Sequence, residues 1–402
     1  MMIGSALRVL IAGGGTGGHL YPGIAVAREL LRRYPDAAIT FAGTARGIES
    51  RIVPREGLPL DLLRSAGIKG KSISARLRGA ALIPVGLADA WGILRARRPH
   101  VVIGVGGYSS GPVVMMAACR GTPTMILEQN AVPGLTNRLL ARVVSAAAVT
   151  FDEATAFFGS KAFVSGNPVR REFFAAAEAQ GGERANEAAV GARVLVFGGS
   201  QGAHAINMAM VAAAAELAAS PFAPRVTHQT GERDLDVVGA AYRDARLDAT
   251  VAPFFYDMDR RLADANVIVC RAGATTLAEI AAAGRAAILI PLPTATDDHQ
   301  RRNAEALAAA GAAEVLIERD ATGPALARQI LGLVADGRRR ADLGRAIRAF
   351  ARPDAAAVIA DRVEGLAARG GWQRPAARRP QPETRSPEPE ARSPKGNVEP
   401  GA

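Results

Sequence analysis

Short apolar runs alternate along the chain with longer stretches in which apolar residues recur every three or four positions. Parallel sheets that are covered by helices on both faces produce this pattern. In the first half, the runs expected to form strands are Arg8 to Ala12, Ala38 to Ala42, Val101 to Gly104, Thr124 to Leu127 and Ala146 to Thr150. In the second half, they are Arg193 to Phe197, Arg225 to Gln229, Val267 to Cys270, Ala287 to Ile290 and Glu314 to Ile317. The sequence therefore predicts an α/β protein with two doubly wound, Rossmann-like parallel sheets.

The restart of the pattern also predicts two domains, because 402 residues exceed what one ordinary hydrophobic core covers. Residues 175–192 are rich in Ala, Gly and Glu and show no strand pattern, so the connection is expected within residues 166–192. We expect an N-terminal domain over residues 1–170 and a C-terminal domain over residues 171–370. Residues 371–402 are rich in Pro, Arg, Glu and Ser, and a segment of this composition is expected to be a disordered tail.

The composition narrows the class of protein further. Hydrophobic residues make up 49% of the chain, which excludes global disorder. Two cysteines cannot form a disulfide framework for a chain of this length, so a reducing compartment is expected. The start of the chain lacks the pattern of a signal peptide, and no apolar run approaches the roughly 18 to 20 residues that span a bilayer. These features predict a cytoplasmic protein without transmembrane segments.

The net charge of +11 indicates an anionic partner, which can be nucleic acid, an anionic membrane surface or a phosphorylated substrate. Aromatic residues make up only 5% of the chain and form no array suited to stacking on bases, so nucleic acid is not expected. Arginines on an ordinary solvated surface would produce the same charge. The charge alone therefore does not choose between a membrane, a phosphorylated substrate and no partner.

Each half opens with a strand, a glycine-rich loop and a helix. The first loop, residues 13–18, has the spacing G-x-G-x-x-G, and the second loop covers residues 198–202. Glycines let the backbone approach a diphosphate, and the N-terminus of the following helix attracts negative charge. An NAD-binding dehydrogenase has the same spacing, but it needs an acidic residue at the end of the second strand, where Ala42-Gly43-Thr44 stands here. The NAD interpretation is therefore disfavoured.

Several polar residues follow predicted strands, where binding loops of such folds lie. His19 can act as a general base, or it can simply orient its helix. Glu279 can accept hydrogen bonds from two ribose hydroxyls, or it can be a first-turn acid that complements the helix dipole. The stretches Glu128-Gln129-Asn130 and Asp297-Asp298-His299-Gln300 also follow strands. None of these groups has the spacing of a metal site; Asp297, Asp298 and His299 could hold a divalent ion, but no metal is expected.

In their order along the chain, these motifs resemble those of the MurG family of glycosyltransferases over about residues 8–365. The matching stretches are Gly13 to His19, Gly106 to Pro112, Glu128 to Asn130, Gly134 to Asn137, Gly166 to Arg170, Gly198 to Gly202, Cys270 to Gly273 and Glu279-Ile280. The resemblance implies a GT-B fold and transfer of N-acetylglucosamine from UDP-GlcNAc to lipid I (undecaprenyl-pyrophosphoryl-MurNAc-pentapeptide), which gives lipid II of peptidoglycan synthesis with inversion. A related UDP-sugar enzyme, such as a UDP-GlcNAc 2-epimerase, and a non-catalytic nucleotide-sugar sensor are the alternatives.

The resemblance also implies roles for individual residues, with the donor on the C-terminal domain and the acceptor on the N-terminal one. Carried over by position, the phosphate ligands are Arg170 and Ser200, the diphosphate and ribose ligands are Ala274, Thr275, Thr276, Leu277, Ala278 and Glu279, the uracil ligand is the backbone of Phe255, and the sugar ligand is Gln300. Thr16, Gly17, Gly18 and Asn130 are implied to line the reaction centre, with His19 as the base and no cofactor. Many relatives carry a histidine where this chain has Leu127, which shifts the catalytic role toward His19.

The stretch from Ile68 to Pro99 mixes basic and apolar residues and contains one acid, Asp89. Helices of this composition can lie on an anionic bilayer, although the apolar residues can equally pack inside the domain. The candidate membrane contacts are Lys69, Lys71, Ile73, Arg76, Leu77, Arg78, Trp91 and Arg95. The resemblance favours the membrane interpretation, because the acceptor of the family carries a polyprenyl chain. We therefore expect peripheral attachment to the anionic inner leaflet, at the cytoplasmic face of the bacterial inner membrane.

Overall fold

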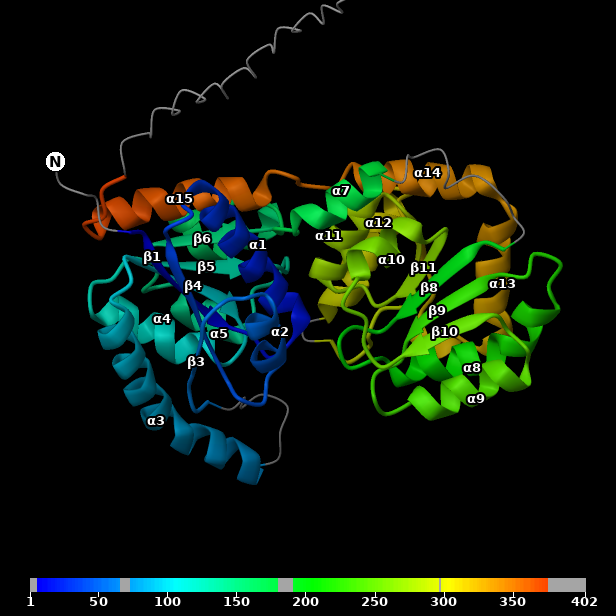
Figure 1. The fold of residues 1–402 in the computed structure, drawn as a ribbon, viewed down its shortest axis with the longest axis horizontal. Coiled ribbons are helices and arrows are strands. Elements are labelled where there is room, and N and C mark those ends of the chain that lie inside the picture. Colours follow the sequence, from blue (N-terminus) through cyan, green and yellow to red (C-terminus); the bar gives the residue numbers. More distant parts are fainter. Residues whose placement is uncertain (1–5, 66–72, 180–190, 296–297, 375–402) are drawn as a thin grey trace, which may run out of the picture.

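The structure is a computed structural model that describes residues 6–65, 73–179, 191–295 and 298–374. Two parallel sheets lie side by side, one in each half of the chain (Figure 1). The N-terminal sheet has seven strands in the order β3-β2-β1-β4-β5-β6-β7. Its strands are β1 (Arg8–Gly13), β2 (Ala38–Gly43), β3 (Leu60–Leu62), β4 (Val101–Gly106), β5 (Thr124–Glu128), β6 (Ala146–Val149) and β7 (Ala162–Val164).

The C-terminal sheet has six strands in the order β10-β9-β8-β11-β12-β13. Its strands are β8 (Arg193–Phe197), β9 (Arg225–Gln229), β10 (Ala249–Ala252), β11 (Val267–Cys270), β12 (Ala286–Leu289) and β13 (Glu314–Val315). In each sheet the chain winds outward from the centre in both directions, so the strand order reverses between β1 and β4 and between β8 and β11. Ligands of such sheets bind beyond the carboxyl ends of the strands at these reversals.

The predicted α/β class with two doubly wound parallel sheets is confirmed. The ten predicted strands are all present; three have the predicted ends, and the ends of the others differ by one or two residues. The prediction lacked β3, β7 and β10, which form edges of the two sheets. These strands have three or four residues each and are partly exposed, so they do not produce a buried apolar run.

Helices cover both faces of the N-terminal sheet. Val9 and Ile11 of β1 pack toward α1 (Gly17–Arg33) and α2 (Glu49–Arg55), whereas Leu10 and Ala12 pack on the opposite face. The helices on that opposite face are α3 (Ile73–Arg97), α4 (Ser110–Cys119), α5 (Leu135–Leu140) and α6 (Thr155–Phe158). Side chains are therefore buried on both sides of the strand, which explains why the strands read as continuous apolar runs.

The C-terminal sheet is covered in the same way. On one face lie α8 (His204–Ala219), α9 (Leu235–Asp244) and α13 (Gly323–Ala335). On the other face lie α7 (Arg171–Ala179), α10 (Met258–Asp264), α11 (Ala274–Ala283) and α12 (His299–Ala309), with α14 (Gly337–Arg348) beside α11.

The last helix, α15 (Ala355–Arg369), returns to the N-terminal half and runs beside α1 (Figure 1). Its buried residues Ile359 and Val363 belong to the core of the N-terminal sheet. Arg33 of α1 also bonds to Asp361, at 2.5 Å, and to Glu364, at 2.8 Å. A division of the sequence at residue 170 places α15 with the C-terminal domain, although α15 packs on the N-terminal one.

The chain thus crosses between the halves twice, first near Gly166 and again near Arg352. The two crossings touch each other, because a Cβ atom added to Gly166 would lie 2.6 Å from Cγ of Arg352. Gly166 also has φ of +75°, a conformation that side chains other than glycine rarely adopt. The pair of crossings forms a narrow hinge between the two domains.

We predict that Ile359→Ala weakens the N-terminal domain, because it removes a fully buried side chain between α15 and the sheet. The expected cost is about 2 to 5 kcal/mol. The two tryptophans, Trp91 and Trp372, both lie in this domain, so the urea midpoint of tryptophan fluorescence reports on it. Ala368→Ser changes an exposed position of the same helix and should leave the midpoint in place. Equal midpoints for the two variants would contradict the assignment of α15 to this core.

Candidate active site

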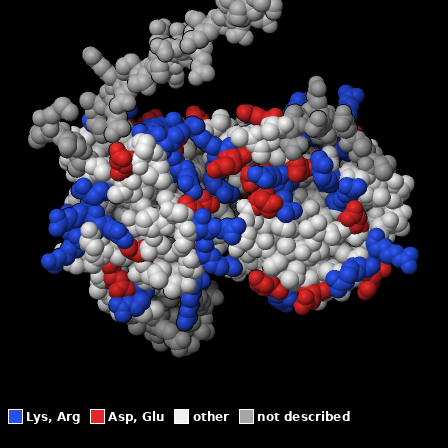
Figure 2. Space-filling view, viewed as in Figure 1, with Lys and Arg blue, Asp and Glu red and all other residues white. Residues whose placement is uncertain are grey.

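A cleft of about 960 Å³ lies between the two domains, at the carboxyl ends of the central strands of both sheets. In the space-filling view a notch separates the two halves, and Lys and Arg side chains line its N-terminal side (Figure 2). The N-terminal domain contributes the loop after β1 and the segment after β5, and the C-terminal domain contributes the loops after β8 and β11. The two strand-order reversals therefore face each other across one cleft.

The glycine loop after β1 surrounds a carboxylate of the protein itself. Glu49, at the start of α2, is fully buried and accepts hydrogen bonds from Gly15 N (2.7 Å) and from Thr44 N (2.8 Å) and Oγ1 (2.9 Å). Cβ atoms added to Gly14 and Gly43 would lie within 2.6 Å of the Glu49 side chain. The glycine spacing thus makes room for this carboxylate. The sequence prediction missed Glu49, since its partner Gly15 lies 34 positions away.

His19 stands in the first turn of α1 and lines the cleft. Its Nδ1 lies 3.1 Å from Oγ1 of Thr16, which fixes the orientation of the ring. The ring packs against Gly106, where an added Cβ would lie 2.6 Å from Cδ2 of His19 and where φ is +98°. Burial, and secondarily the charge of His299, lower the pKa of His19 to about 4. The imidazole is therefore neutral near pH 7 and keeps a lone pair that can accept a proton.

The segment after β5 is held by Glu128. Its buried carboxylate accepts hydrogen bonds from Asn130 N (3.0 Å) and Nδ2 (3.2 Å), from Gly134 N (3.0 Å) and from Asn137 Nδ2 (2.9 Å). Burial raises the pKa of Glu128, and these four bonds oppose that rise. Asn130 reaches the cleft from this segment, whereas the preceding Leu127 is buried in the domain core. The Leu127 side chain therefore points to the core and not to the reaction centre.

On the opposite wall, the N-terminus of α11 opens into the cleft. Glu279 lies on this helix and lines the same cavity. Burial raises the pKa of Glu279 to about 7, and the positive charge of Arg170 opposes the rise. The carboxylate of Glu279 is thus near its titration midpoint at neutral pH, and hydroxyl donors from a ligand would stabilise its charged form.

Gln229 connects the other two loops of this wall. Its Nε2 donates to Gly199 O at 2.8 Å, and its Oε1 accepts from Phe255 N at 2.8 Å. The loop that contains Ser200 is therefore tied to the segment that contains Phe255. Since the amide of Phe255 is engaged, its carbonyl oxygen is the backbone group suited to bind a base. The sequence prediction missed Gln229, which ends a strand that carries no recognisable motif.

Arg170 enters the cleft from the crossing between the domains. Its guanidinium lies 4.5 Å from the ring centre of Tyr21 and 5.0 Å from that of Phe173, and its Nη1 is 3.8 Å from Glu56. The Nε of Arg170 is buried and has no hydrogen-bond partner among the described residues. Because Arg170 lines the cleft, its positive charge favours an anionic ligand there.

The structure brings most of the predicted substrate residues to the cleft. They are Thr16, Gly17, Gly18, His19, Asn130, Arg170, Ser200, Phe255, Ala274, Thr275, Thr276, Glu279 and Gln300. Leu277 and Ala278 do not line it, because their side chains lie on the face of α11 that packs against the sheet. The implied roles of Leu277 and Ala278 as ligands of the diphosphate and ribose stay a prediction.

Of the predicted membrane contacts, Lys69 and Lys71 lie outside the described residues, and so do the side chains of Ile73, Arg76, Leu77 and Arg78. Trp91 and Arg95 are described, and both are exposed on α3. The Trp91 side chain lies under the guanidinium of Arg120, at 4.3 Å from the ring centre.

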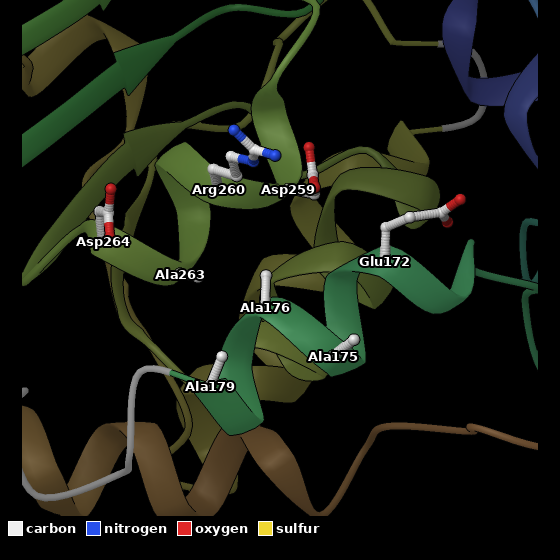
Figure 3. Close-up of a pocket in the computed structure, with 8 residues that line it drawn as sticks. All are labelled: Glu172, Ala175, Ala176, Ala179, Asp259, Arg260, Ala263 and Asp264. Carbon is white, nitrogen blue, oxygen red and sulfur yellow. The ribbon is translucent and has the colours of Figure 1, made fainter. Parts of the chain in front are cut away.

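A second hollow of about 410 Å³ lies between α7 and α10 (Figure 3). Half of its lining residues are alanines, and the others are three acids and one arginine: Glu172, Asp259, Asp264 and Arg260. This excess of negative charge repels an anionic nucleotide, so the interdomain cleft is the better site for one. In the described parts of the chain, no group of three or more His, Cys, Asp or Glu residues is placed to hold a metal ion.

Comparisons with known proteins agree with this arrangement. Residues 9–149 match the N-terminal domain of glycosyltransferase family 28, and residues 193–359 match its C-terminal domain. A protein of Pelobacter propionicus is 47% identical over 89% of this chain and 99% of its own length. One of Geobacter sulfurreducens is 46% identical over 88% and 97%. Both are named UDP-N-acetylglucosamine--N-acetylmuramyl-(pentapeptide) pyrophosphoryl-undecaprenol N-acetylglucosamine transferase.

Solved structures also show similarity to this family. The crystal structure of Acinetobacter baumannii MurG superposes with a TM-score of 0.66 at 29% identity, over 89% of this chain and 99% of that one. A UDP-GlcNAc 2-epimerase of Neisseria meningitidis reaches a TM-score of 0.62 at 12% identity, which shows the fold alone. Two facing doubly wound domains with a site between them form a GT-B fold, and the family 28 matches identify the class as glycosyltransferase. Within this class, the chain belongs to the MurG family.

We predict that UDP-GlcNAc binds more tightly as the pH rises through about 7, because ribose hydroxyls donate to the ionised form of Glu279. The diphosphate of UDP-GlcNAc has no ionisation near neutral pH, so the ligand does not contribute to this effect. As the pH rises toward 7, the Kd from calorimetry should fall by up to about tenfold per pH unit. Above pH 7 the Kd should be constant.

Glu279→Gln is the matched control, and it should lose this pH dependence and bind more weakly by about 2 to 3 kcal/mol. The difference between the two proteins isolates Glu279 from the histidines of the cleft. The same pH dependence in both proteins would exclude Glu279 as the titrating ligand.

Proposed function

We propose that this chain transfers N-acetylglucosamine from UDP-GlcNAc to the muramyl sugar of lipid I and forms lipid II with inversion at the anomeric carbon. One observation carries the proposal: His19 of the N-terminal domain, whose pKa is lowered by burial, lines the same cleft as the N-terminus of α11, a helix end suited to an anion. The curated relatives that span nearly the whole chain are named for this transfer. The UDP-GlcNAc 2-epimerase shares the fold at only 12% sequence identity, so it gives the epimerase alternative less support.

The donor is proposed to lie on the C-terminal wall of the cleft. The N-terminus of α11 and the guanidinium of Arg170 bind the diphosphate, and Ser200 donates its hydroxyl to a phosphate oxygen. Glu279 accepts the ribose hydroxyls, and the carbonyl of Phe255 accepts the N–H of uracil.

The sugar of the donor would then point toward Gln300. Its Oε1 accepts a hydrogen bond from Leu292 N at 3.0 Å, which turns the side-chain amide group of Gln300 toward the cavity as a donor to sugar hydroxyls. Thr16 and Asn130 border the reaction centre from the opposite wall.

The reaction is a direct displacement. His19 takes the proton of the acceptor hydroxyl as the oxygen attacks the anomeric carbon, and the bond from that carbon to the diphosphate oxygen breaks on the opposite face. Because Nδ1 of His19 lies against Thr16, Nε2 is the nitrogen that accepts the proton. The bond electrons remain on UDP, whose charge is stabilised by the helix terminus and by Arg170. The anionic donor also raises the basicity of the neighbouring imidazole.

The test of this function is a transfer assay with labelled UDP-GlcNAc and a short-chain lipid I analogue. The proposal expects labelled disaccharide on the lipid and UDP in equal amounts. Formation of the 2-epimer of the donor sugar in the absence of acceptor would instead support the epimerase. Binding of UDP-GlcNAc without either product would identify a sensor.

We also propose that the enzyme attaches peripherally to the anionic cytoplasmic face of the inner membrane. No helix of the described residues is long and apolar enough to cross a bilayer. On α3, at the outer edge of the N-terminal domain, Trp91 and Ile83 are 48% and 45% exposed, and Arg95 is exposed one turn after Trp91 (Figure 1). Exposed apolar side chains next to cations bind anionic bilayers.

We predict that His19→Ala lowers turnover by about 10² to 10⁴, because the acceptor hydroxyl loses its base. The affinity for UDP should remain nearly unchanged, since the ring belongs to the wall opposite the donor ligands. Single-turnover assays and calorimetry separate the two effects. Full turnover of the variant would reduce His19 to a structural residue.

We predict that the protein co-sediments with vesicles that contain anionic lipid and that high salt weakens this binding. Arg95→Glu combined with Trp91→Ser should weaken it further, by roughly 1 kcal/mol per lost cation and more for the lost apolar contact. Arg328→Glu makes the same charge change at an exposed position of α13, in the other domain, and should have little effect. If both variants sediment alike, α3 is not the contact surface.

A further inference from the structure

The hydroxyl of Thr275 joins three parts of the molecule. It donates to Gly18 O at 2.7 Å and accepts from Asn167 Nδ2 at 3.0 Å. Thr275 belongs to the first turn of α11, Gly18 to the first turn of α1, and Asn167 to the crossing between the domains. The Thr275 side chain is buried, and so is the side chain of Asn167.

The direction of these bonds is fixed. An amide nitrogen only donates, so Asn167 occupies a lone pair of the Thr275 hydroxyl. A hydroxyl has a single proton, and the Thr275 proton therefore points to the carbonyl of Gly18. Asn167, which follows Gly166 in the hinge, thus orients the Thr275 hydroxyl toward Gly18 across the cleft.

The two residues joined by this hydrogen bond are neighbours of the proposed base and of the proposed donor ligands. Gly18 immediately precedes His19, whereas Thr276 and Glu279 follow Thr275 on the same helix. A change in the distance from Gly18 to Thr275 therefore changes the distance from the base to the bound donor. Displacement reactions depend steeply on that distance, and a shift of about 1 Å can lower the rate by 10²-fold.

We propose that Thr275 is a positioning residue that holds His19 in register with the donor helix α11. This inference rests on the proposed transfer reaction and differs from the role that the resemblance implies, in which Thr275 is a ligand of the donor. The hydroxyl faces Gly18 and Asn167, so its hydrogen-bonding capacity is used within the protein. The donor is bound by the neighbouring positions of the helix.

A second contact between the domains limits the effect of losing Thr275. The guanidinium of Arg55, on α2, lies 3.7 Å from the ring centre of Tyr256 in the C-terminal domain. Because this stacking contact does not involve Thr275, the domains should stay together when the hydroxyl is removed. The expected defect is therefore one of alignment.

The test compares Thr275→Val, which keeps the shape and removes the hydroxyl, with Thr275→Ser, which restores it. For Thr275→Val we expect kcat to fall by about 10- to 100-fold while the Kd for UDP stays within about threefold. Thr275→Ser should recover kcat to within about threefold of the wild type. Thr322→Val, which removes a hydroxyl cap of α13 remote from the cleft, controls for loss of stability alone.

Two further measurements separate alignment from a general structural effect. Hydrogen exchange of peptides from the start of α1 should speed up in Thr275→Val and not in Thr322→Val. The acid limb of kcat/KM for the acceptor, at saturating donor, should also move to higher pH in Thr275→Val, since a loosened cleft hydrates His19 and raises its pKa.

The outcomes are distinct. Equal losses of kcat and UDP affinity would make Thr275 a donor ligand and overturn the inference. Wild-type kcat in Thr275→Val would overturn it as well. A wild-type protein that binds UDP but performs no transfer would refute the proposed function, whereas the exchange of the α1 peptides would still decide whether Thr275 holds the two domains in register.

Discussion

The buried carboxylate of Glu49 makes the two glycine-rich loops differ in their ability to bind a phosphate. The carboxylate accepts a hydrogen bond from Gly15 N, and the absence of side chains at Gly14 and Gly43 leaves space for the Glu49 side chain. A phosphate at this loop would meet a negative charge that is already bonded, so the loop is a poor diphosphate site. The proposed phosphate site is therefore in the C-terminal domain, where the N-terminus of α11 opens directly into the cleft. In the proposed function, the same arrangement of strand, glycine loop and helix therefore binds the acceptor in one domain and the donor in the other.

The position of His19 follows from the same constraint. With the loop held by Glu49, α1 begins at the reversal between β1 and β4, and the ring of His19 fits against Gly106 at the end of β4. The facing reversal between β8 and β11 presents α11 at the opposite wall. Since the chain crosses between the domains only through the narrow hinge at Gly166 and Arg352, the two walls need a contact near the chemistry to fix their distance. The hydrogen bond from Thr275 to Gly18 is the contact that we propose for this role.

Much of this architecture could be predicted from the sequence, because buried strands and glycine loops are local patterns. The exposed edge strands could not, since three partly exposed residues such as those of β3 leave no pattern. Long-range contacts were also beyond local patterns: Gly15 and Glu49 are 34 positions apart, and Gly18 and Thr275 are 257 apart. For the same reason, nothing in the composition of α15 indicates that it packs on the first domain. The motifs located the cleft, and the structure supplied the partners that position its residues.

The central claim is that the glycine loop of the N-terminal domain is occupied by Glu49 and that the nucleotide binds only opposite it. A crystal structure with UDP-GlcNAc bound tests this most directly. The account predicts the diphosphate at the N-terminus of α11, with Gly15 N still bonded to Glu49. A diphosphate at Gly13 to Gly18, with the Glu49 carboxylate displaced from Gly15, would contradict it.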